Sequence, residues 1–214
     1  MKKVYFISGL GADKRAFSFL DLSYCQPVFI DWPAPSANET LQSYAHRIFQ
    51  TIKDEEAIIV GLSFGGMLAT EIAKKYPQTK VILISSCKTY KEIPGYLRFW
   101  RYLPLYKLHS HRLKKLSGMV PSKVLGVTGA EQKKIQRQIL NDSDPAFTRW
   151  AIGAILNWKN MTVPQNITHI HGTADSLLPY KYVQPHHTIQ GGAHIMIMDK
   201  ATEVSELLRK IVLA

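Results

Sequence analysis

The chain has few cysteines and no long apolar run. Cys25 and Cys87 are the only two cysteines among 214 residues, which excludes a disulfide framework and a Cys-x-x-Cys zinc site. No stretch approaches the roughly 18 consecutive apolar residues of a membrane span. The apolar run after Lys2 and Lys3 ends after four residues, too short for the core of a signal peptide. These absences predict a soluble, cytoplasmic protein.

Acidic residues are also scarce. The chain holds 16 Asp and Glu against 27 Lys and Arg, a formal net charge of +11. Between residues 88 and 159 there are 14 basic and four acidic side chains, so nearly the whole excess lies in one block. That concentration indicates a separate structural role for the block. With 46% hydrophobic residues, the chain has enough apolar material for the core of one domain.

Short apolar runs alternate with helical patterns in the first part of the chain. The runs are typical of buried strands and lie at residues 4–7, 28–30, 57–60 and 81–84. Helical patterns separate them at 41–52 and 67–76, and Ser36 with Glu39 forms a candidate capping box ahead of the first helix. Continuous apolar strands separated by helices predict an α/β fold with a parallel sheet covered on both faces.

This alternation stops at residue 88. Helical patterns without a strand follow near residues 96–103, 109–116, 130–140 and 145–158. Strand patterns resume at 167–170 and 186–189, and an amphipathic helix over 198–212 closes the chain. The sequence therefore predicts a core made of residues 1–87 and 161–214, interrupted by a helical insertion over 88–160.

One motif carries a chemical signal. A predicted strand runs into Gly61-Leu62-Ser63-Phe64-Gly65, and a predicted helix follows. A tight strand-to-helix turn of this kind holds its serine in a strained conformation, and side chains two positions before and after it would collide. Ser63 is therefore the candidate nucleophile.

A serine hydroxyl needs a base to take its proton, and the base needs an orienting acid. Asp175 follows the predicted strand at 167–170, in His171-Gly172-Thr173-Ala174-Asp175. His194 follows the predicted strand at 186–189, in Gly191-Gly192-Ala193-His194. The order serine, acid, histidine is the order that a serine hydrolase built on a parallel sheet requires.

Other residues compete for these roles. Asp199 is more typical of the start of the last helix and Asp31 of a turn, while Cys87 lacks the strained turn and is interpreted as a buried thiol. His169 with His171, like His109 with His111, has the spacing of metal ligands on one strand face. No carboxylate or cysteine cluster accompanies either pair, so we expect no metal and no cofactor. His171 is interpreted as packing beneath the loop of Asp175.

These motifs, in this order, resemble the α/β-hydrolase superfamily, and the resemblance covers nearly the whole chain. It implies a small esterase-like serine hydrolase whose helical insertion is a cap. It also implies a mostly parallel sheet of about six strands, because the first two strands of the family are missing. By the same resemblance, the backbone N–H groups of Leu10 and Phe64 form the oxyanion hole, and Ser8 replaces the usual histidine of that loop.

The predicted activity is hydrolysis of a carboxylic ester, thioester or amide by Ser63, Asp175 and His194. Two alternatives stay open, a non-catalytic protein that binds anionic lipid or nucleic acid through its basic cap, and an acyltransferase. The basic block fits an anionic acyl substrate or peripheral contact with a membrane, and no motif for specific nucleic-acid binding is present. Nothing in the sequence indicates an oligomeric state.

Two groups of side chains in the insertion carry further expectations. We expect five aromatic residues to form the apolar underside of the cap over Ser63: Tyr90, Tyr96, Phe99, Trp100 and Tyr102. We expect five residues to anchor the last cap helix: Trp150, Ile152, Ile155, Leu156 and Trp158.

Overall fold

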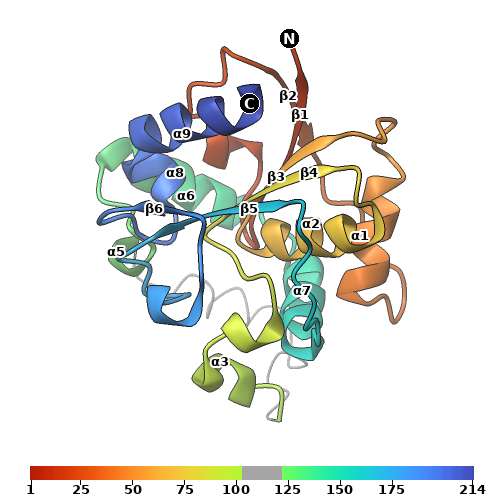
Figure 1. Cartoon of the computed structure of the whole chain (residues 1–214). Coiled ribbons are helices and arrows are strands. Elements are labelled where there is room, and N and C mark those ends of the chain that lie inside the picture. The colour runs from red at the N-terminus through yellow and green to blue at the C-terminus, as the bar shows by residue number, and fades with distance from the viewer. Residues whose placement is uncertain (103–121) are drawn as a thin grey trace.

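Six parallel strands form a single sheet in the computed structural model, which describes residues 1–102 and 122–214 (Figure 1). The sheet order is β2-β1-β3-β4-β5-β6. The strands are β1 (Lys3–Ile7), β2 (Gln26–Ile30), β3 (Ile58–Leu62), β4 (Lys80–Ile84), β5 (Ile167–Gly172) and β6 (His187–Ile189). The predicted fold class and the predicted number of strands are confirmed.

Both faces of this sheet are buried. In β1, Tyr5 and Ile7 point into one apolar core, whereas Val4 and Phe6 point into the other. The first core is covered by α1 (Leu41–Phe49) and α2 (Phe64–Lys75). The second is covered by the 3-10 helix η1 (Lys14–Phe17), α8 (Met196–Asp199) and α9 (Ala201–Leu213) (Figure 1). Burial on both sides explains why the strands are continuously apolar in sequence.

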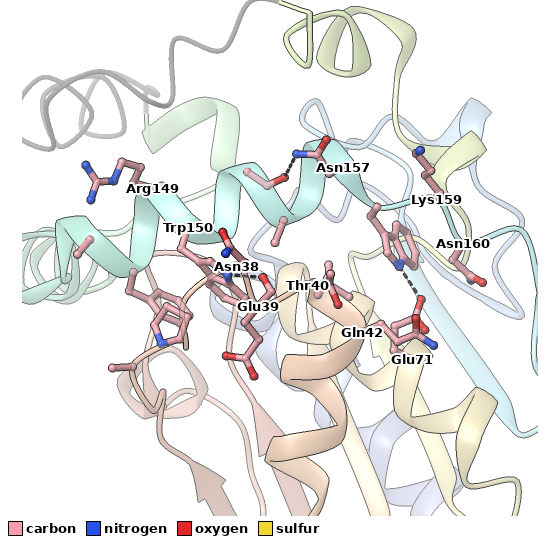
Figure 2. Close-up of a pocket in the computed structure, with 18 of the residues that line it drawn as sticks. Asn38, Glu39, Thr40, Gln42, Glu71, Arg149, Trp150, Asn157, Lys159 and Asn160 are labelled. Carbon is pink, nitrogen blue, oxygen red and sulfur yellow. Dashed lines mark hydrogen bonds between the residues drawn. The ribbon is translucent and has the colours of Figure 1, made fainter.

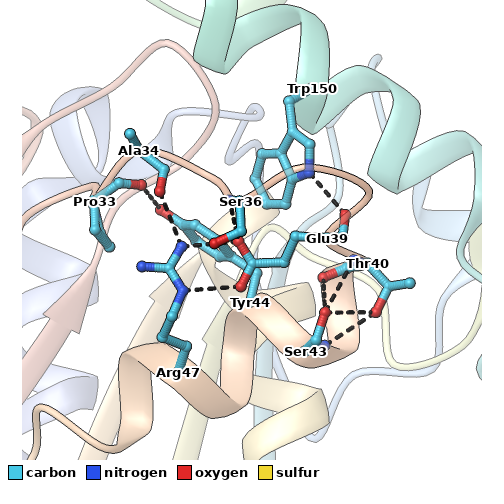
Figure 3. Close-up of polar contacts among 9 residues, drawn as sticks. All are labelled: Pro33, Ala34, Ser36, Glu39, Thr40, Ser43, Tyr44, Arg47 and Trp150. Atoms are coloured by element: carbon cyan, nitrogen blue, oxygen red, sulfur yellow. Dashed lines mark hydrogen bonds and ion pairs between the residues drawn. The ribbon is translucent and has the colours of Figure 1, made fainter.

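The start of α1 differs from the prediction. The reciprocal cap is formed by Thr40 and Ser43, each of whose hydroxyl groups accepts a hydrogen bond from the other residue's N–H, at 3.1 and 2.9 Å (Figure 3). Glu39 accepts a hydrogen bond from the Ser36 amide, but its carboxylate also binds the Arg47 guanidinium at 2.8 and 2.9 Å. The predicted Ser36–Glu39 box was wrong because the helix begins only at Leu41, beyond the reach of Ser36.

The described part of the segment between β4 and β5 contains helices and no strand. It contains α3 (Gly95–Phe99), α5 (Ser122–Leu125), α6 (Ala130–Asp142) and α7 (Pro145–Asn157). The predicted helix near 109–116 lies outside the described residues. Among the described helices, none combines the length and the apolar character needed to cross a membrane.

Two of the five residues predicted to anchor the last helix of this segment, Trp150 and Trp158, make anchoring contacts. The Trp158 indole donates a hydrogen bond to the buried carboxylate of Glu71 in α2 at 2.6 Å. The Trp150 ring packs against Tyr44 of α1, with ring centroids 4.4 Å apart. Two tryptophans of the insertion therefore hold α7 against the helices that cover the sheet.

The predicted aromatic underside was wrong for four of its residues. The exposed fractions of Tyr96, Phe99, Trp100 and Tyr102 are 54, 56, 45 and 73%. They lie on and just after α3, a helix of only five residues that is set apart from the helices covering the sheet (Figure 1). So short a helix, away from the core, offers these rings little to pack against.

Candidate active site

The strand-to-helix turn after β3 holds Ser63 in a conformation that non-glycine residues rarely adopt. Its φ is 50° and its ψ is −115°. A Cβ atom on Gly61 would lie 2.6 Å from the Gly65 carbonyl oxygen, and one on Gly65 would collide with the carbonyl oxygens of β1 and its loop. The Gly-x-Ser-x-Gly spacing is therefore required by backbone contacts on both sides of the serine.

The strained turn is held by the loop after β4. The Ser63 amide donates to the Ile84 carbonyl at 2.9 Å, and the Ser86 hydroxyl donates to the Ser63 carbonyl at 2.6 Å. Ser86 was missed in the sequence because a small polar residue two positions after a strand carries no signal of its own. These hydrogen bonds stabilise a backbone conformation that otherwise costs about 1–3 kcal/mol.

The structure brings Ser63, His194 and Asp175 into one chain of hydrogen bonds. Ser63 Oγ lies 2.9 Å from His194 Nε2, and His194 Nδ1 lies 2.8 Å from Asp175 Oδ2. His194 and Asp175 are only 4 and 3% exposed, whereas Ser63 remains partly accessible. A neutral imidazole placed this way can accept the hydroxyl proton at Nε2 while it donates Nδ1–H to the carboxylate.

The loop after β5 satisfies the other oxygen of Asp175. Asp175 Oδ1 accepts hydrogen bonds from the amides of Leu177 and Leu178 at 2.9 and 2.8 Å. Burial by itself would raise the pKa of Asp175, but the adjacent His194 and the amide donors outweigh it and hold that pKa below its ordinary value. The carboxylate is therefore ionised at neutral pH.

The loop after β1 passes next to Ser63. A Cβ atom added to Gly9 would lie 3.3 Å from Ser63 Cβ. Neither the Leu10 nor the Phe64 amide donates a hydrogen bond to another described residue; Leu10 follows Gly9, and Phe64 follows Ser63 directly. These are the two donors that the sequence predicts for an oxyanion hole.

Two side chains fix the curl of that loop. The buried Ser8 hydroxyl donates to the Ala12 carbonyl at 2.9 Å, and the Trp32 indole donates to the same oxygen at 3.2 Å. The Ala12 amide closes the turn onto the Gly9 carbonyl at 3.0 Å. Ser8 thus supplies a hydrogen bond inside the loop, and Trp32 ties the loop to the segment after β2.

The competing residues are placed elsewhere. Asp31 is exposed after β2, and Asp199 ends α8, where burial raises its carboxyl pKa. Cys87 is fully buried, and burial raises its pKa well above the ordinary value, so it is a neutral thiol. His109 and His111 lie outside the described residues. Within residues 1–102 and 122–214, no group of three or more His, Cys, Asp or Glu side chains could hold a metal ion.

Two contrasting groups of side chains adjoin the turn that carries Ser63. One consists of the buried residues His169, His171, Asp175 and His194, here called the polar flank. The other consists of five rings that pack together and include the residue after Ser63, here called the aromatic flank: Trp32, Tyr44, Phe64, Phe147 and Trp150. His171 lies beneath the Asp175 loop, as predicted, and its Nε2 is 2.8 Å from the Leu178 carbonyl oxygen.

A pocket of about 1160 Å³ lies beyond the aromatic flank (Figure 2). It is lined by residues of α7, of the beginning of α1 and of α2, and Trp150, Trp158 and Glu71 contribute to its walls. Arg149 and Lys159 of the insertion also border it, together with Glu39. Ser63 is not among its lining residues, so this pocket is separate from the candidate active site.

Comparison with known proteins places the chain in a family. The chain resembles solved structures along its full length. An esterase from Exiguobacterium antarcticum has a TM-score of 0.75 at 15% identity, covering 100% of this chain and 92% of its own. An enol-lactonase from Burkholderia xenovorans LB400 has a TM-score of 0.74 at 14% identity, with the same coverage. A bromoperoxidase from Bacillus anthracis has a TM-score of 0.65 at 14% identity, again with 100% and 92% covered.

At such low identities the structural likeness establishes the fold alone. No curated protein sequence matches the chain. A model of the alpha/beta hydrolase family, however, matches residues 4–207, which is almost the entire sequence. The chain therefore belongs to the alpha/beta hydrolase family.

Proposed function

We propose that the protein is a serine hydrolase that cleaves a carboxylic ester, or a related thioester or amide, through an acyl-enzyme on Ser63. The observation that carries this proposal is the hydrogen-bonded chain from Ser63 Oγ through His194 to Asp175. An unactivated serine is a poor nucleophile, so a buried imidazole within 2.9 Å of its oxygen is the feature that supports acyl chemistry.

In the first half of the reaction, the proton of Ser63 moves along the hydrogen-bonded side chains to His194. Ser63 Oγ attacks the carbonyl carbon while its proton passes to His194 Nε2. Asp175 stabilises the imidazolium that forms and holds the Nδ1–H tautomer. The tetrahedral intermediate then collapses, the bond to the leaving group breaks, and His194 returns the proton to the leaving oxygen, sulfur or nitrogen.

The second half repeats these steps with water. Water attacks the acyl carbon, His194 accepts its proton, and the proton returns to Ser63 Oγ as the acid is released. In both halves the amides of Leu10 and Phe64 would donate to the oxyanion. One such donor contributes about 3 kcal/mol to the transition state in other enzymes.

A covalent probe and a substrate panel test this function directly. A fluorophosphonate should label the wild type on the peptide that contains Ser63, and short p-nitrophenyl esters should be hydrolysed. Ser63→Ala should abolish labelling and lower kcat by at least about 10⁴-fold. The matched control is Ser23→Ala, because Ser23 is exposed and far along the chain from the strained turn. Labelling of the Ser63→Ala variant, or equal turnover by it, would refute the proposal.

Acyl transfer to an acceptor other than water uses the same acyl-enzyme, so the same site supports it as the second candidate. The two are separated by partitioning: adding an alcohol or thiol acceptor to the ester assay diverts product to the new ester or thioester in a transferase. In a hydrolase the free acid remains the main product.

The basic insertion bears on the substrate class. Among its described cations, Arg98 lies over the Tyr90 ring and Arg101 over the Tyr102 ring, at 5.6 and 5.5 Å. Three further cations of the insertion that could attract an anionic substrate, Arg112, Lys114 and Lys115, lie outside the described residues. We extend the proposal to anionic acyl substrates, whose kcat/KM should fall with ionic strength while that of a matched neutral ester stays level.

A further inference from the structure

His171 lies directly behind the acid of the proposed active site and has no part in the mechanism above. It is the second-last residue of β5, and its side chain is fully buried. Its Nε2 lies 2.8 Å from the Leu178 carbonyl oxygen and 3.4 Å from Asp175 Oδ2. A carbonyl oxygen and a carboxylate oxygen can only accept, so Nε2 must carry the proton.

The opposite nitrogen of His171 is held by a second histidine. His171 Nδ1 lies 3.2 Å from His169 Nε2, and the two rings are nearly perpendicular at 83°. Burial lowers the pKa of both imidazoles, so both are neutral at pH 7. His171 Nδ1 is then a lone pair, and His169 must donate Nε2–H to it. His169 Nδ1 makes no hydrogen bond of good geometry among the described residues, although the backbone of Ser86 lies close to this imidazole.

The hydrogen bonds around Asp175 therefore run toward it from both sides. His194 donates to Asp175 Oδ2 from the Ser63 side. From the other side, His171 Nε2–H closes onto Leu178, whose amide in turn donates to Asp175 Oδ1. The positive end of the same N–H bond also faces Asp175 Oδ2.

We propose that His171 is a positioning residue for Asp175: its Nε2–H closes the 175–178 loop and faces Oδ2, and His169 fixes the tautomer that places the proton there. This inference rests on the proposed function, because it assigns a role within the same site. His171 touches neither Ser63 nor His194 within hydrogen-bond distance, so it acts through the carboxylate rather than on the substrate.

Other titratable and charged groups surround the histidine pair. Lys88 is buried, donates to the Gln184 carbonyl and lies near Glu92. His186 Nδ1 accepts the His169 amide at 2.8 Å. The groups that act on or pack against the pair are thus Asp175, His194, Lys88, His186 and Tyr180, with Cys87 and Glu92 adjoining them. Of these groups, Asp175 is the one whose oxygen faces His171 Nε2–H, while the hydrogen bond itself goes to the Leu178 carbonyl.

A pair of variants separates positioning from packing. Gln at position 171 can place an N–H at the distance of Nε2, whereas Asn is shorter and cannot. We expect His171→Asn to lower kcat for p-nitrophenyl acetate about tenfold, with KM nearly unchanged. The His171 N–H that faces Oδ2 offsets part of the negative charge of Asp175. Without it, the carboxylate stabilises the His194 imidazolium more strongly, so the acid limb of the kcat/KM profile should move to higher pH by about half a unit. His171→Gln should restore both values most of the way.

Several results would overturn the inference. They are an unmoved acid limb in His171→Asn, an equal loss in the Gln and Asn variants, or a rise of KM in place of the fall in kcat. Circular dichroism and thermal melting establish that each variant is folded. If His171→Asn does not fold, His169→Leu is the second test, since loss of the tautomer-fixing donor should give a smaller change in the same direction.

A substrate-free readout keeps this inference distinct from the proposed function. The downfield proton resonance of His194 Nδ1–H reports its hydrogen bond to Asp175. It should shift in His171→Asn and return in His171→Gln, and an identical resonance in all three proteins contradicts the positioning role. Absence of fluorophosphonate labelling in the wild type, by contrast, refutes the proposed function without touching the geometry of Asp175.

Discussion

The polar flank and the aromatic flank position Ser63 by different physical means. The polar flank is built from single directional contacts, such as His194 Nδ1 to Asp175 Oδ2 at 2.8 Å. The aromatic flank relies instead on the contact area between packed rings. Trp32 packs on Phe147 and Phe64, with ring centroids 5.0 and 5.7 Å apart. The polar flank therefore determines where protons and charge lie, whereas the aromatic flank determines the shape of the surrounding core.

The few hydrogen bonds of the aromatic flank support this distinction. Trp32 donates to the Ala12 carbonyl. Tyr44 donates to the Pro33 carbonyl and Trp150 to the Glu39 carbonyl, each at 2.8 Å (Figure 3). Each goes to backbone, and none reaches Ser63, His194 or Asp175. A change of one atom should therefore disturb catalysis strongly in the polar flank and weakly in the aromatic flank, whereas a large loss of volume should act mainly on stability.

The largest effect is expected for a one-atom exchange at Asp175. In Asp175→Asn the amide N–H₂ can face His194 Nδ1, which favours the wrong imidazole tautomer. We expect kcat to fall about 10⁴-fold, as in a protease with the same three groups, with little change in melting temperature. Tyr44→Phe is the matched one-atom change in the aromatic flank and should alter kcat only a few-fold. Activity of Asp175→Asn within tenfold of the wild type would show that another group orients the histidine.

A large loss of side-chain volume in the aromatic flank should have the opposite effect, a large loss of stability with little change in kcat. Phe147 is 7% exposed and packs against Trp32 and Trp150. Phe147→Ala should lower the free energy of unfolding by about 3–4 kcal/mol, from lost burial and a residual cavity. Urea denaturation measures this, and kcat below the transition should stay within tenfold of the wild type. Phe147→Leu, which keeps most of the volume, should lose about 1 kcal/mol. If Phe147→Ala lost catalysis without losing stability, the proposed distinction between the two flanks would be wrong.

The sequence predicts the parts of this arrangement that local sterics determine. Gly61 is required by contacts within its own turn, Gly65 by the close passage of β1 and its loop, and the continuous apolar strands by burial on both faces. The order of Ser63, Asp175 and His194 then follows from placing loops at one edge of a parallel sheet. These features could be inferred because each leaves a short motif or a simple repeating pattern in the sequence.

The rest depends on contacts between loops that the chain brings together only when folded. The Trp32 indole reaches Ala12, twenty residues away, and Ser86 reaches Ser63 across the sheet edge. The tautomers of His169 and His171 follow from which acceptors surround them, and no spacing encodes that. The exposed ring of Trp100 illustrates the converse: an aromatic pattern indicates an apolar face, but the pattern does not say what covers it.

The smallest expected effect is a pH dependence confined to the polar flank. Burial lowers the pKa of His169 well below its ordinary value, so the folded protein leaves this imidazole neutral while the unfolded chain protonates it below about pH 6.5. The unfolded state then binds more protons, and stability must fall as the pH falls. Burial raises the pKa of Tyr44 far above this range, so that hydroxyl of the aromatic flank contributes nothing to the effect.

His169→Gln removes this titration but keeps an N–H for His171. Between pH 7.5 and pH 5, the wild type should lose about 2 kcal/mol more unfolding free energy than the variant, as measured by urea denaturation at each pH. Comparing the change with pH, rather than absolute values, cancels the cost of the substitution itself. His187→Gln is the matched control, because His187 is exposed at the edge of the sheet and its loss should leave the slope unchanged. Parallel curves for wild type and His169→Gln would mean that the buried imidazole takes up a proton in the folded protein as readily as in the unfolded chain, which would contradict its burial as a neutral group.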